Sequence, residues 1–284
     1  MNKKVYIVAG PTASGKSSLA VRLAQKLNSV VVNADSLQVY EDVPILTARP
    51  DESEMKGVPH LLYGYLDCRS HETVSSWVER AKKAVADIEN PVFVGGTGLY
   101  LKVLTEGLSP LPEISDEVRQ KVRQMTPEQL AAYAHDAPLT DPQRLMRAAE
   151  VFMQSGRPLS YFYQLPKTGG MVADYRVILI NPPREKLYSQ CNYRFEQMMS
   201  RGALKQVVDL VEKNPNMDGG VFQALGVREL IGFLKQETSL EEAVSKAQQK
   251  TRNYAKRQRT WFAHQIKADV VLSDASTIDI DSLI

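Results

Sequence analysis

The feature that most constrains this 284-residue chain is a glycine-containing loop between an apolar segment and an amphipathic one. Residues 10–17 read Gly-Pro-Thr-Ala-Ser-Gly-Lys-Ser and match the pattern G-x-x-x-x-G-K-[ST]. Residues 5–9 are apolar, as in a buried strand, and the residues after the loop place Leu19, Leu23 and Leu27 on one helical face. Strand, loop and helix in this order predict a phosphate-binding loop.

The residues of this loop suit the binding of an anion with several oxygens. Backbone N–H groups around Gly15 can point at one anion, and the following helix adds its partial positive charge. Lys16 supplies a full charge for an outer phosphate, and the Ser17 hydroxyl is a candidate ligand of Mg²⁺. A glycine turn with no ligand is the alternative. We predict that the loop binds two or more phosphates, with Mg²⁺ as cofactor, through Gly10, Thr12, Ala13, Ser14, Gly15, Lys16 and Ser17.

The composition is ordinary for a globular protein and argues against several classes. The longest apolar runs are far too short to span a bilayer, and residues 1–4 pass directly into the first predicted strand, unlike a secretory signal. Cys68 and Cys191 are isolated, which argues against a disulfide scaffold and a zinc site and fits a reducing compartment. We therefore expect a cytoplasmic protein with no membrane partner.

Two further apolar segments end in polar or glycine-rich residues. Residues 30–33 are followed by Asp35, and residues 91–94 are followed by Gly-Gly-Thr-Gly, which contains Thr97. Ligands of parallel α/β sheets bind just beyond the carboxyl ends of the strands, so we expect both side chains near the phosphate loop. The glycines are expected to allow a ligand to approach the backbone closely. Each of the two polar residues has an alternative role as a helix cap.

These segments predict an α/β fold with a P-loop NTPase-like parallel sheet flanked by helices. The Ser-Pro-Leu-Pro run at residues 109–112 is the clearest boundary signal. We predict that residues 113–139 form a small helical insertion and that residues 1–112 and 140–284 form the core domain, with a helical C-terminal segment. A helix with Pro at its first turn is predicted to begin at residues 141–142.

The charge is distributed unevenly, although the net charge is only +2. Residues 243–268 contain no Asp or Glu, and they carry Lys246, Lys250, Arg252, Lys256, Arg257, Arg259 and Lys267. This basic stripe indicates a contact with a polyanion, and a solvated basic face is the alternative.

The chemistry that these residues alone allow stays open between several classes. A nucleotide-hydrolysing switch needs an apolar strand that ends in Asp, and residues 91–94 end in glycine instead. Asp35 follows another strand, where small-molecule kinases often hold the acceptor. The phosphate loop and Asp35 are therefore compatible with a small-molecule kinase.

Seven blocks of the sequence resemble the bacterial tRNA dimethylallyltransferases, also called tRNA isopentenyltransferases. The blocks are residues 10–17, 35–40, 47–50, 94–100, 106–112, 141–145 and 251–258. The resemblance runs from residue 5 to about residue 262. The chain ends at Ile284 without a zinc-finger extension, which favours the bacterial type, and it has Val227 where the family usually has an aromatic residue.

The resemblance implies transfer of a dimethylallyl group from dimethylallyl diphosphate to N6 of the adenine 3′ of the anticodon, with release of diphosphate. It implies that Lys16 and Ser17 hold the diphosphate and its Mg²⁺. Asp35 would accept a hydrogen bond and then a proton from N6. Thr97 would contact the flipped adenine or the leaving group. Arg194 would bind the diphosphate, although a lone arginine on a helix usually faces solvent.

The resemblance also implies that the partner is the anticodon stem-loop of tRNA. The residues expected to contact it are Asp35, Ser36, Leu37, Gln38, Thr97, Arg119, Gln143, Arg144, Arg147, Gln223, Arg228, Arg252, Lys256 and Arg257. The alternatives are a small-molecule kinase, an adenylate isopentenyltransferase acting on free nucleotide, and an RNA-binding protein whose loop senses a nucleotide. The basic stripe and residues 141–147 favour tRNA, and we expect a monomer.

Overall fold

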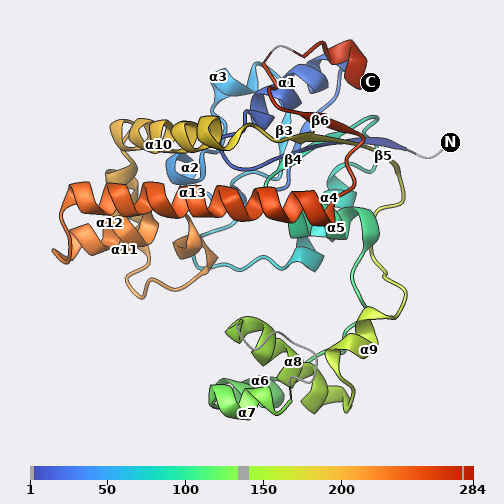
Figure 1. The fold of residues 1–284 in the computed structure, drawn as a ribbon, viewed down its shortest axis with the longest axis vertical. Coiled ribbons are helices and arrows are strands. Elements are labelled where there is room, and N and C mark those ends of the chain that lie inside the picture. Colours follow the sequence, from blue (N-terminus) through green and yellow to red (C-terminus); the bar gives the residue numbers. More distant parts are fainter. Residues whose placement is uncertain (1–2, 134–140, 277) are drawn as a thin grey trace. The chain divides into compact units, whose positions relative to one another are not determined.

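The computed structural model of the chain describes residues 3–133, 141–276 and 278–284 (Figure 1). Contacts between residues divide the chain into two compact units. One unit comprises Met1–Thr105 with Met171–Ile284, and the other comprises Glu106–Gly170. The first unit contains the phosphate loop and every strand of the sheet, so the site is built within it.

The first unit is built on a six-stranded sheet whose paired strands are all parallel. The strand order is β3-β2-β4-β1-β5-β6. The strands are β1 (Lys4–Ala9), β2 (Val31–Asn33), β3 (His60–Leu61), β4 (Val92–Gly95), β5 (Asp174–Ile180) and β6 (Val270–Leu272). The predicted α/β fold class is confirmed. Because β2, β4 and β1 are neighbours, the loops that follow them meet at one edge of the sheet.

Helices cover the sheet on both faces. Those of the first unit are α1 (Lys16–Lys26), α2 (Pro44–Thr47), α3 (Glu52–Met55), α4 (Val74–Ala84), α5 (Gly98–Glu106), α10 (Arg184–Ser200), α11 (Ala203–Lys213), α12 (Val227–Leu234) and α13 (Leu240–Gln265), with short 3₁₀ turns η1 (Gly220–Gln223) and η2 (Ile280–Leu283). Figure 1 shows α1 on one side of the strands and α4 and α5 on the other.

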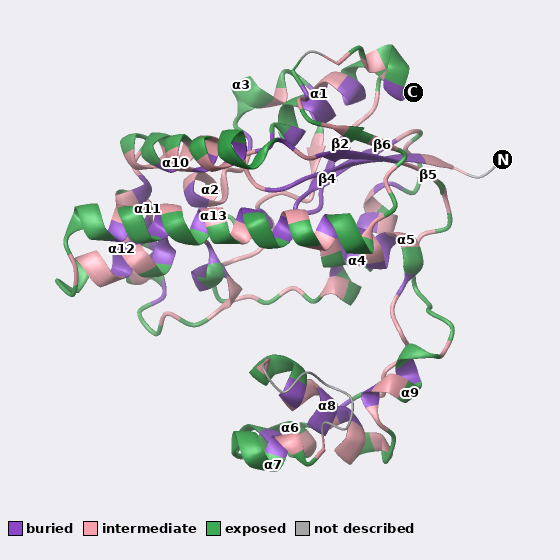
Figure 2. Cartoon of the chain, in the orientation of Figure 1, coloured by how far each residue is buried: buried purple, intermediate pink, exposed green. Residues whose placement is uncertain are grey.

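The core has two layers because successive side chains of a strand point to opposite faces. On one face, Leu19 and Leu23 of α1 pack with Tyr6 and other strand residues. On the opposite face, Trp77 of α4 lies edge-on to Phe93 of β4, with ring centroids 6.4 Å apart. Both faces are covered, so the central strands are buried along their length (Figure 2) and read as continuous apolar runs in the sequence.

The C-terminal segment is helical, as predicted. Gly202 between α10 and α11 has a φ of +98° and separates these two helices. After α13 the chain returns to the sheet, where β6 pairs with β5 as an edge strand. That strand is too short to be recognised from its pattern.

The second unit is larger than the predicted insertion at residues 113–139. Its helices are α6 (Asp116–Arg123), α7 (Pro127–Ala131), α8 (Pro142–Ser155) and α9 (Leu159–Tyr163). Leu145 of α8 and Phe162 of α9 share a core with Val122 and Leu130. The prediction placed α8 and α9 in the core domain, but their apolar faces are buried against α6 and α7. Part of the predicted insertion, residues 134–139, lies outside the described residues.

Within the described parts of the chain, we find no helix that combines the length and the apolar character needed to cross a membrane.

Candidate functional site

The phosphate loop has the shape that its sequence predicts. It joins β1 to α1, and Ala13 and Gly15 have φ values of +61° and +85°. The Ser14 N–H donates to the Pro11 carbonyl over 3.3 Å, which closes a turn within the loop. The Ser14 hydroxyl is buried, and no described protein group bonds to it. A buried hydroxyl without a partner is costly, so this loop is suited to an oxygen-rich ligand.

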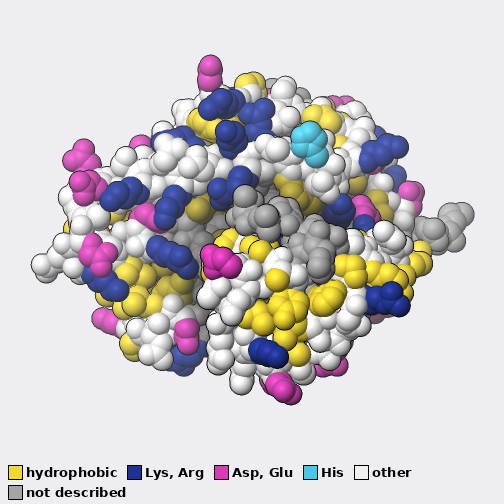
Figure 3. All heavy atoms as spheres, turned by 60° about the horizontal axis from the view of Figure 1, so that its bottom comes forward, with side chains coloured by type: hydrophobic (Ala, Val, Ile, Leu, Met, Phe, Trp, Pro, Cys, Tyr) yellow, Lys and Arg dark blue, Asp and Glu magenta, His cyan; other side chains and the backbone are white. Residues whose placement is uncertain are grey.

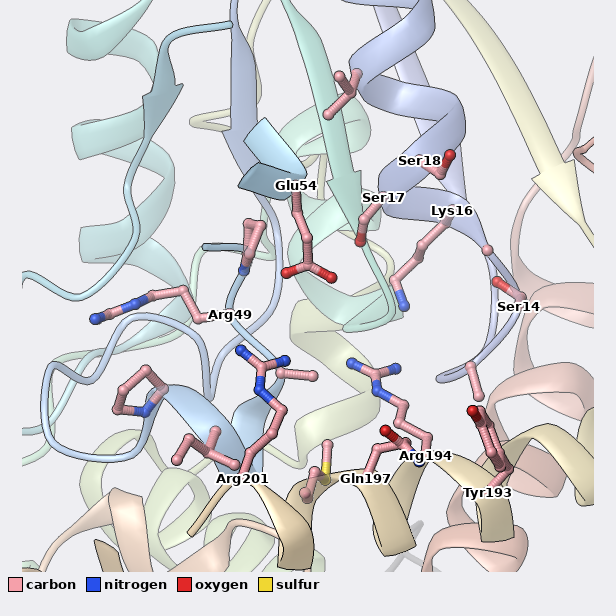
Figure 4. Close-up of a pocket in the computed structure, with 18 of the residues that line it drawn as sticks. Ser14, Lys16, Ser17, Ser18, Arg49, Glu54, Tyr193, Arg194, Gln197 and Arg201 are labelled. Carbon is pink, nitrogen blue, oxygen red and sulfur yellow. The ribbon is translucent and has the colours of Figure 1, made fainter. Parts of the chain in front are cut away.

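A cavity of about 590 Å³ opens beside the loop. Its cationic lining residues are Lys16, Arg49, Lys56, Arg194 and Arg201, and Glu54 is the carboxylate among them. Figure 4 shows the ammonium of Lys16 and the guanidinium of Arg194 pointing toward one another across the space, from α1 and α10. Such an excess of positive charge around a concave space favours an anionic ligand.

Burial makes this positive charge energetically unfavourable in the free protein. The pKa of Lys16 is lowered to about 8 by burial and by the nearby charge of Arg194. Burial also lowers the pKa of Arg194, while the carboxylate of Asp35 opposes the shift in both groups. Arg194 donates to the hydroxyl of Thr12 over 3.3 Å, so it belongs to the loop despite its place on a distant helix. A bound anion would stabilise both cations.

Asp35 is held rigidly at the end of β2. The fully buried Asn33 accepts a hydrogen bond from the Asp35 N–H (2.9 Å) and donates one to the Asp35 carbonyl (3.0 Å). One carboxylate oxygen, Oδ1, accepts from the Leu37 N–H over 3.0 Å. No donor in the described residues hydrogen-bonds to the other oxygen, Oδ2. The capping role and a chemical role are therefore compatible, because each uses a different oxygen.

Thr97 connects the Asp35 loop to the next strand end. Its hydroxyl accepts from the Ser36 N–H over 3.0 Å and donates to the Ser36 hydroxyl over 3.3 Å. Thr97 and Tyr254 line a second hollow of about 190 Å³, with Leu99 and Trp261 among its walls. The negative charge of Asp35 partly opposes the lowering of the Lys16 pKa and adds to the raising of the Tyr254 pKa. The Asp35 loop also bonds to Thr97 in the wall of the hollow, so Asp35 lies near both the cationic cavity and the aromatic hollow.

Comparison with known proteins identifies the family. A family model described as IPP transferase matches residues 38–265. The tRNA dimethylallyltransferase of Zymomonas mobilis is 41% identical over 275 residues, which is 92% of this chain and 88% of that protein. The tRNA dimethylallyltransferase of Erythrobacter litoralis is 42% identical over 284 residues, which is 93% and 89% of the two chains.

The chain belongs to the IPP transferase family. The resemblance seen in the seven sequence blocks is thereby confirmed.

Solved structures of IPP transferases share the fold. The tRNA delta(2)-isopentenylpyrophosphate transferase of Staphylococcus epidermidis superimposes with a TM-score of 0.71 at 30% identity, covering 98% of this chain and 95% of that one. A eukaryotic dimethylallyltransferase acting on tRNA gives a TM-score of 0.83 at 28% identity, covering 97% and 74%. The sheet and the helices that carry the site are therefore those of the IPP transferases.

The glycines at the end of β4 and just after it have close neighbours within the protein. A Cβ on Gly95 would clash with the backbone of Ala34, one on Gly96 with Gln258, and one on Gly98 with the ring of Trp261. The close approach that these glycines allow is that of the protein itself. They let α13 and the Asp35 loop pack against the end of β4.

Predicted RNA-contacting residues of the first unit fall into two groups. Asp35, Ser36 and Leu37 are half-buried at the site, together with Thr97. Gln38 differs, because its buried amide donates to the carbonyls of Thr47 and Ala48, each over 3.0 Å. Its side chain is therefore used within the protein. Among the predicted RNA contacts of this unit, the exposed ones are Gln223, Arg228, Lys256 and Arg257. Arg252 is half-buried and hydrogen-bonded to Asn192.

The basic stripe on α13 has one acidic partner that its own sequence lacks. Lys250 is ion-paired with Glu229 of the neighbouring helix α12. In the described chain, neither Lys256 nor Arg257 has an Asp or Glu partner, and Arg257 lies 5.7 Å from the ring centre of Tyr254. Val227, where the family usually has an aromatic residue, is fully buried and faces the core of the protein.

The remaining predicted RNA contacts belong to the second unit. Gln143, Arg144 and Arg147 lie in the first two turns of α8. Asp141 caps the N-terminus of this helix, because its side chain accepts from the N–H groups of Gln143 and Arg144. Arg147 is paired with Glu150, with 3.1 Å between their side-chain atoms. Arg119 of α6 bonds to the Ile114 carbonyl over 3.3 Å. Arg119 lies on α6 and the other three residues lie on α8, and these two helices share the core of the second unit.

Several residues of the site are missing from the sequence prediction. Gln197 and Arg201 line the cavity with Arg194, and their spacing of three and four residues along α10 is the signal that predicts one helical face. Glu54 lines the same cavity from α3, a helix whose capping box uses Asp51 and Glu54. Asn33 bonds to the residue two positions along the chain, as in an Asx turn, so an Asn at the end of a predicted strand is the local signal that could have indicated this contact.

Proposed function

We propose that this chain transfers the dimethylallyl group from dimethylallyl diphosphate to N6 of the adenine 3′ of the anticodon in tRNA. The observation that carries the proposal is that the Asp35 loop lies close to both a cationic cavity and an aromatic hollow. One space suits a diphosphate, the other suits a base, and a carboxylate lies near both. Membership of the IPP transferase family supports the same assignment.

The cationic cavity would bind the diphosphate and stabilise it as a leaving group. Negative charge grows on the diphosphate as the allylic carbon–oxygen bond breaks. Lys16, Arg194 and the amides of the phosphate loop are fixed where that charge develops, so they favour the transition state over the ground state. The Ser17 hydroxyl lines the cavity and is a hard oxygen donor, so it fits a Mg²⁺ ion, which would further neutralise the diphosphate.

Asp35 would act on the acceptor. The lone pair of adenine N6 is delocalised into the ring, so N6 is a weak nucleophile. As the N6–carbon bond forms and the carbon–oxygen bond breaks, N6 loses one proton, and Asp35 Oδ2 is the candidate acceptor for it. The adenine must leave its stack to reach the carbon. The hollow lined by Thr97, Tyr254 and Trp261 offers aromatic and polar contacts for such a base.

Contacts with the RNA backbone would come from exposed cations. Lys256 and Arg257 lie on α13 beside the aromatic hollow and are not neutralised by carboxylates of the described chain. Figure 3 shows that Lys and Arg side chains are exposed at the surface, with Asp and Glu among them. Exposed cations of this kind suit contacts with the phosphates of an RNA. We further propose that the protein acts as a monomer in the cytoplasm.

One incubation separates this function from its rivals. Purified protein is mixed with Mg²⁺, labelled dimethylallyl diphosphate, and either tRNA or AMP. We expect label in tRNA and not in AMP. Label in AMP alone would select an adenylate isopentenyltransferase, and label in neither acceptor would reject prenyl transfer. Phosphorylation of a small acceptor from ATP would instead support a kinase.

A further inference from the structure

Gln258 of α13 connects two loops of the site with one side chain. It is 5% exposed. Its Oε1 accepts from the Thr12 N–H over 2.8 Å, and its Nε2 donates to the Gly96 carbonyl over 2.8 Å. A backbone N–H can only donate and a carbonyl can only accept, so these two partners determine which way the amide points.

The contact requires a close approach of α13 to the sheet. A Cβ on Gly96 would clash with the Gln258 amide, so glycine at that position makes room for it. Tyr254, one turn earlier on α13, lines the same hollow as Thr97 and Gln258, and Gln258 itself bonds to both loops. A single turn of this helix therefore holds the loop after β4 and the phosphate loop together.

The same turn carries the exposed cations Lys256 and Arg257. Arg257 lines the aromatic hollow next to Gln258, whereas Lys256 lies about 160° around the helix from Gln258. The Gln258 side chain accepts from the N–H of Thr12, and the Thr12 hydroxyl accepts from Arg194. A small displacement of α13 would thus move the Thr12 amide and change the support of Arg194. The proposed RNA contacts and the residue that holds the proposed diphosphate cradle therefore lie within one helical turn.

We propose that Gln258 is a positioning residue that couples RNA binding on α13 to diphosphate binding in the phosphate loop. The inference rests on the proposed function, because it takes tRNA and a diphosphate as the two ligands. If RNA stabilises the α13 position that holds Thr12, RNA tightens diphosphate binding, and diphosphate must tighten RNA binding by the same factor. Gln258 carries the coupling through its two backbone hydrogen bonds.

The test measures the affinity of inorganic pyrophosphate with Mg²⁺, by calorimetry, with and without an anticodon stem-loop RNA. For the unaltered protein we expect the RNA to tighten pyrophosphate binding by about fivefold or more. Gln258→Met keeps the length of the side chain and removes both hydrogen bonds. The ratio of pyrophosphate affinities with and without RNA should therefore fall to about one. Gln258→Glu keeps an acceptor for Thr12 but has no donor for Gly96, so it should retain part of the ratio.

The matched control is Gln265→Met, an exposed glutamine two turns further along α13. This variant should keep the full ratio. The inference is overturned if RNA leaves the pyrophosphate affinity of the unaltered protein unchanged, or if folded Gln258→Met or Gln258→Glu keeps the full ratio. Those results would leave prenyl transfer intact, whereas an unaltered protein that binds no pyrophosphate would overturn both proposals. If Gln258→Met does not fold, Gln258→Glu alone decides.

Discussion

Arg194 of α10 donates a hydrogen bond to the hydroxyl of Thr12 in the phosphate loop, over 3.3 Å. The contact joins residues 182 positions apart and brings a second cation to the side of Lys16. It explains why this arginine, which the helix pattern alone would place in solvent, belongs to the site. Two buried cations side by side are unfavourable until an anion joins them, and several predictions rest on that fact.

Replacing Lys16 should separate stability from binding. The pKa of Lys16 is lowered from 10.5 to about 8, so keeping the ammonium charged in the free protein costs up to about 3 kcal/mol. We expect Lys16→Met to raise the free energy of unfolding at pH 7 by about 2 kcal/mol and to weaken pyrophosphate binding at least about a hundredfold. Thermal melts and calorimetry measure the two effects. A lower melting temperature would show that the charge is not destabilising.

The affinity for pyrophosphate should depend on pH through Lys16. Above pH about 8 the free protein loses the Lys16 proton, and an anion binds the neutral amine poorly, so affinity should fall as pH rises through that value. For stability the sign is opposite. Between about 8 and 10.5 the unfolded chain holds more protons than the folded one, so this group adds stability as pH rises. Calorimetry across this pH range should show that the pyrophosphate affinity of Lys16→Met depends less on pH than that of the unaltered protein.

Asp35→Asn should stop transfer while leaving diphosphate binding largely intact. The amide oxygen can still accept from the Leu37 N–H, so the loop keeps its turn, but the proton acceptor is lost. We expect the rate of transfer to fall by about 10²- to 10⁴-fold. Single-turnover assays and pyrophosphate titration measure the two effects. Asp209→Asn, on the exposed face of α11, is the control, and an equal loss of binding in Asp35→Asn would contradict the role as base.

Gly98→Ala should destabilise the protein, because the added methyl group meets the ring of Trp261. We expect a loss of about 1–3 kcal/mol and reduced transfer to tRNA, since Trp261 lines the aromatic hollow. Gly232→Ala is a matched control within α12, where the nearest side-chain atom is 3.6 Å from the new Cβ. Alanine favours helix there, so that variant should gain up to about 1 kcal/mol. Denaturant titration distinguishes the two, and equal stability would argue against the packing role.

Lys256→Ala and Arg257→Ala should weaken tRNA binding mainly at low salt. Each removes one proposed phosphate contact, so the slope of log affinity against log salt concentration should decrease by about one per variant. The transfer rate at saturating tRNA should change little. Lys205→Ala, an exposed lysine paired with Asp209 on α11, serves as control and should keep the slope. An unchanged slope in all three would place the RNA elsewhere.

How far the sequence predicts the fold depends on how local each feature is. The phosphate loop, the strand at residues 91–94 and α13 rest on patterns within one segment, and the structure has all three. The insertion boundary was misplaced, because an apolar face such as that of Leu145 does not say which partner it packs against. Glu229, the partner of Lys250, lies on another helix and could not be found by reading along α13.

The sequence by itself determined the glycine-containing loop between a strand and a helix, the α/β class and the family, because these follow from residue order and short spacings. The tertiary structure decided the rest. It inserted β4 between β2 and β1, so that the segment with Thr97 follows the strand that lies between those preceding Asp35 and the phosphate loop. It turned Arg194 and Gln258 inward onto Thr12. Both outcomes depend on which distant surfaces are buried together, and that is a property of the whole packed chain.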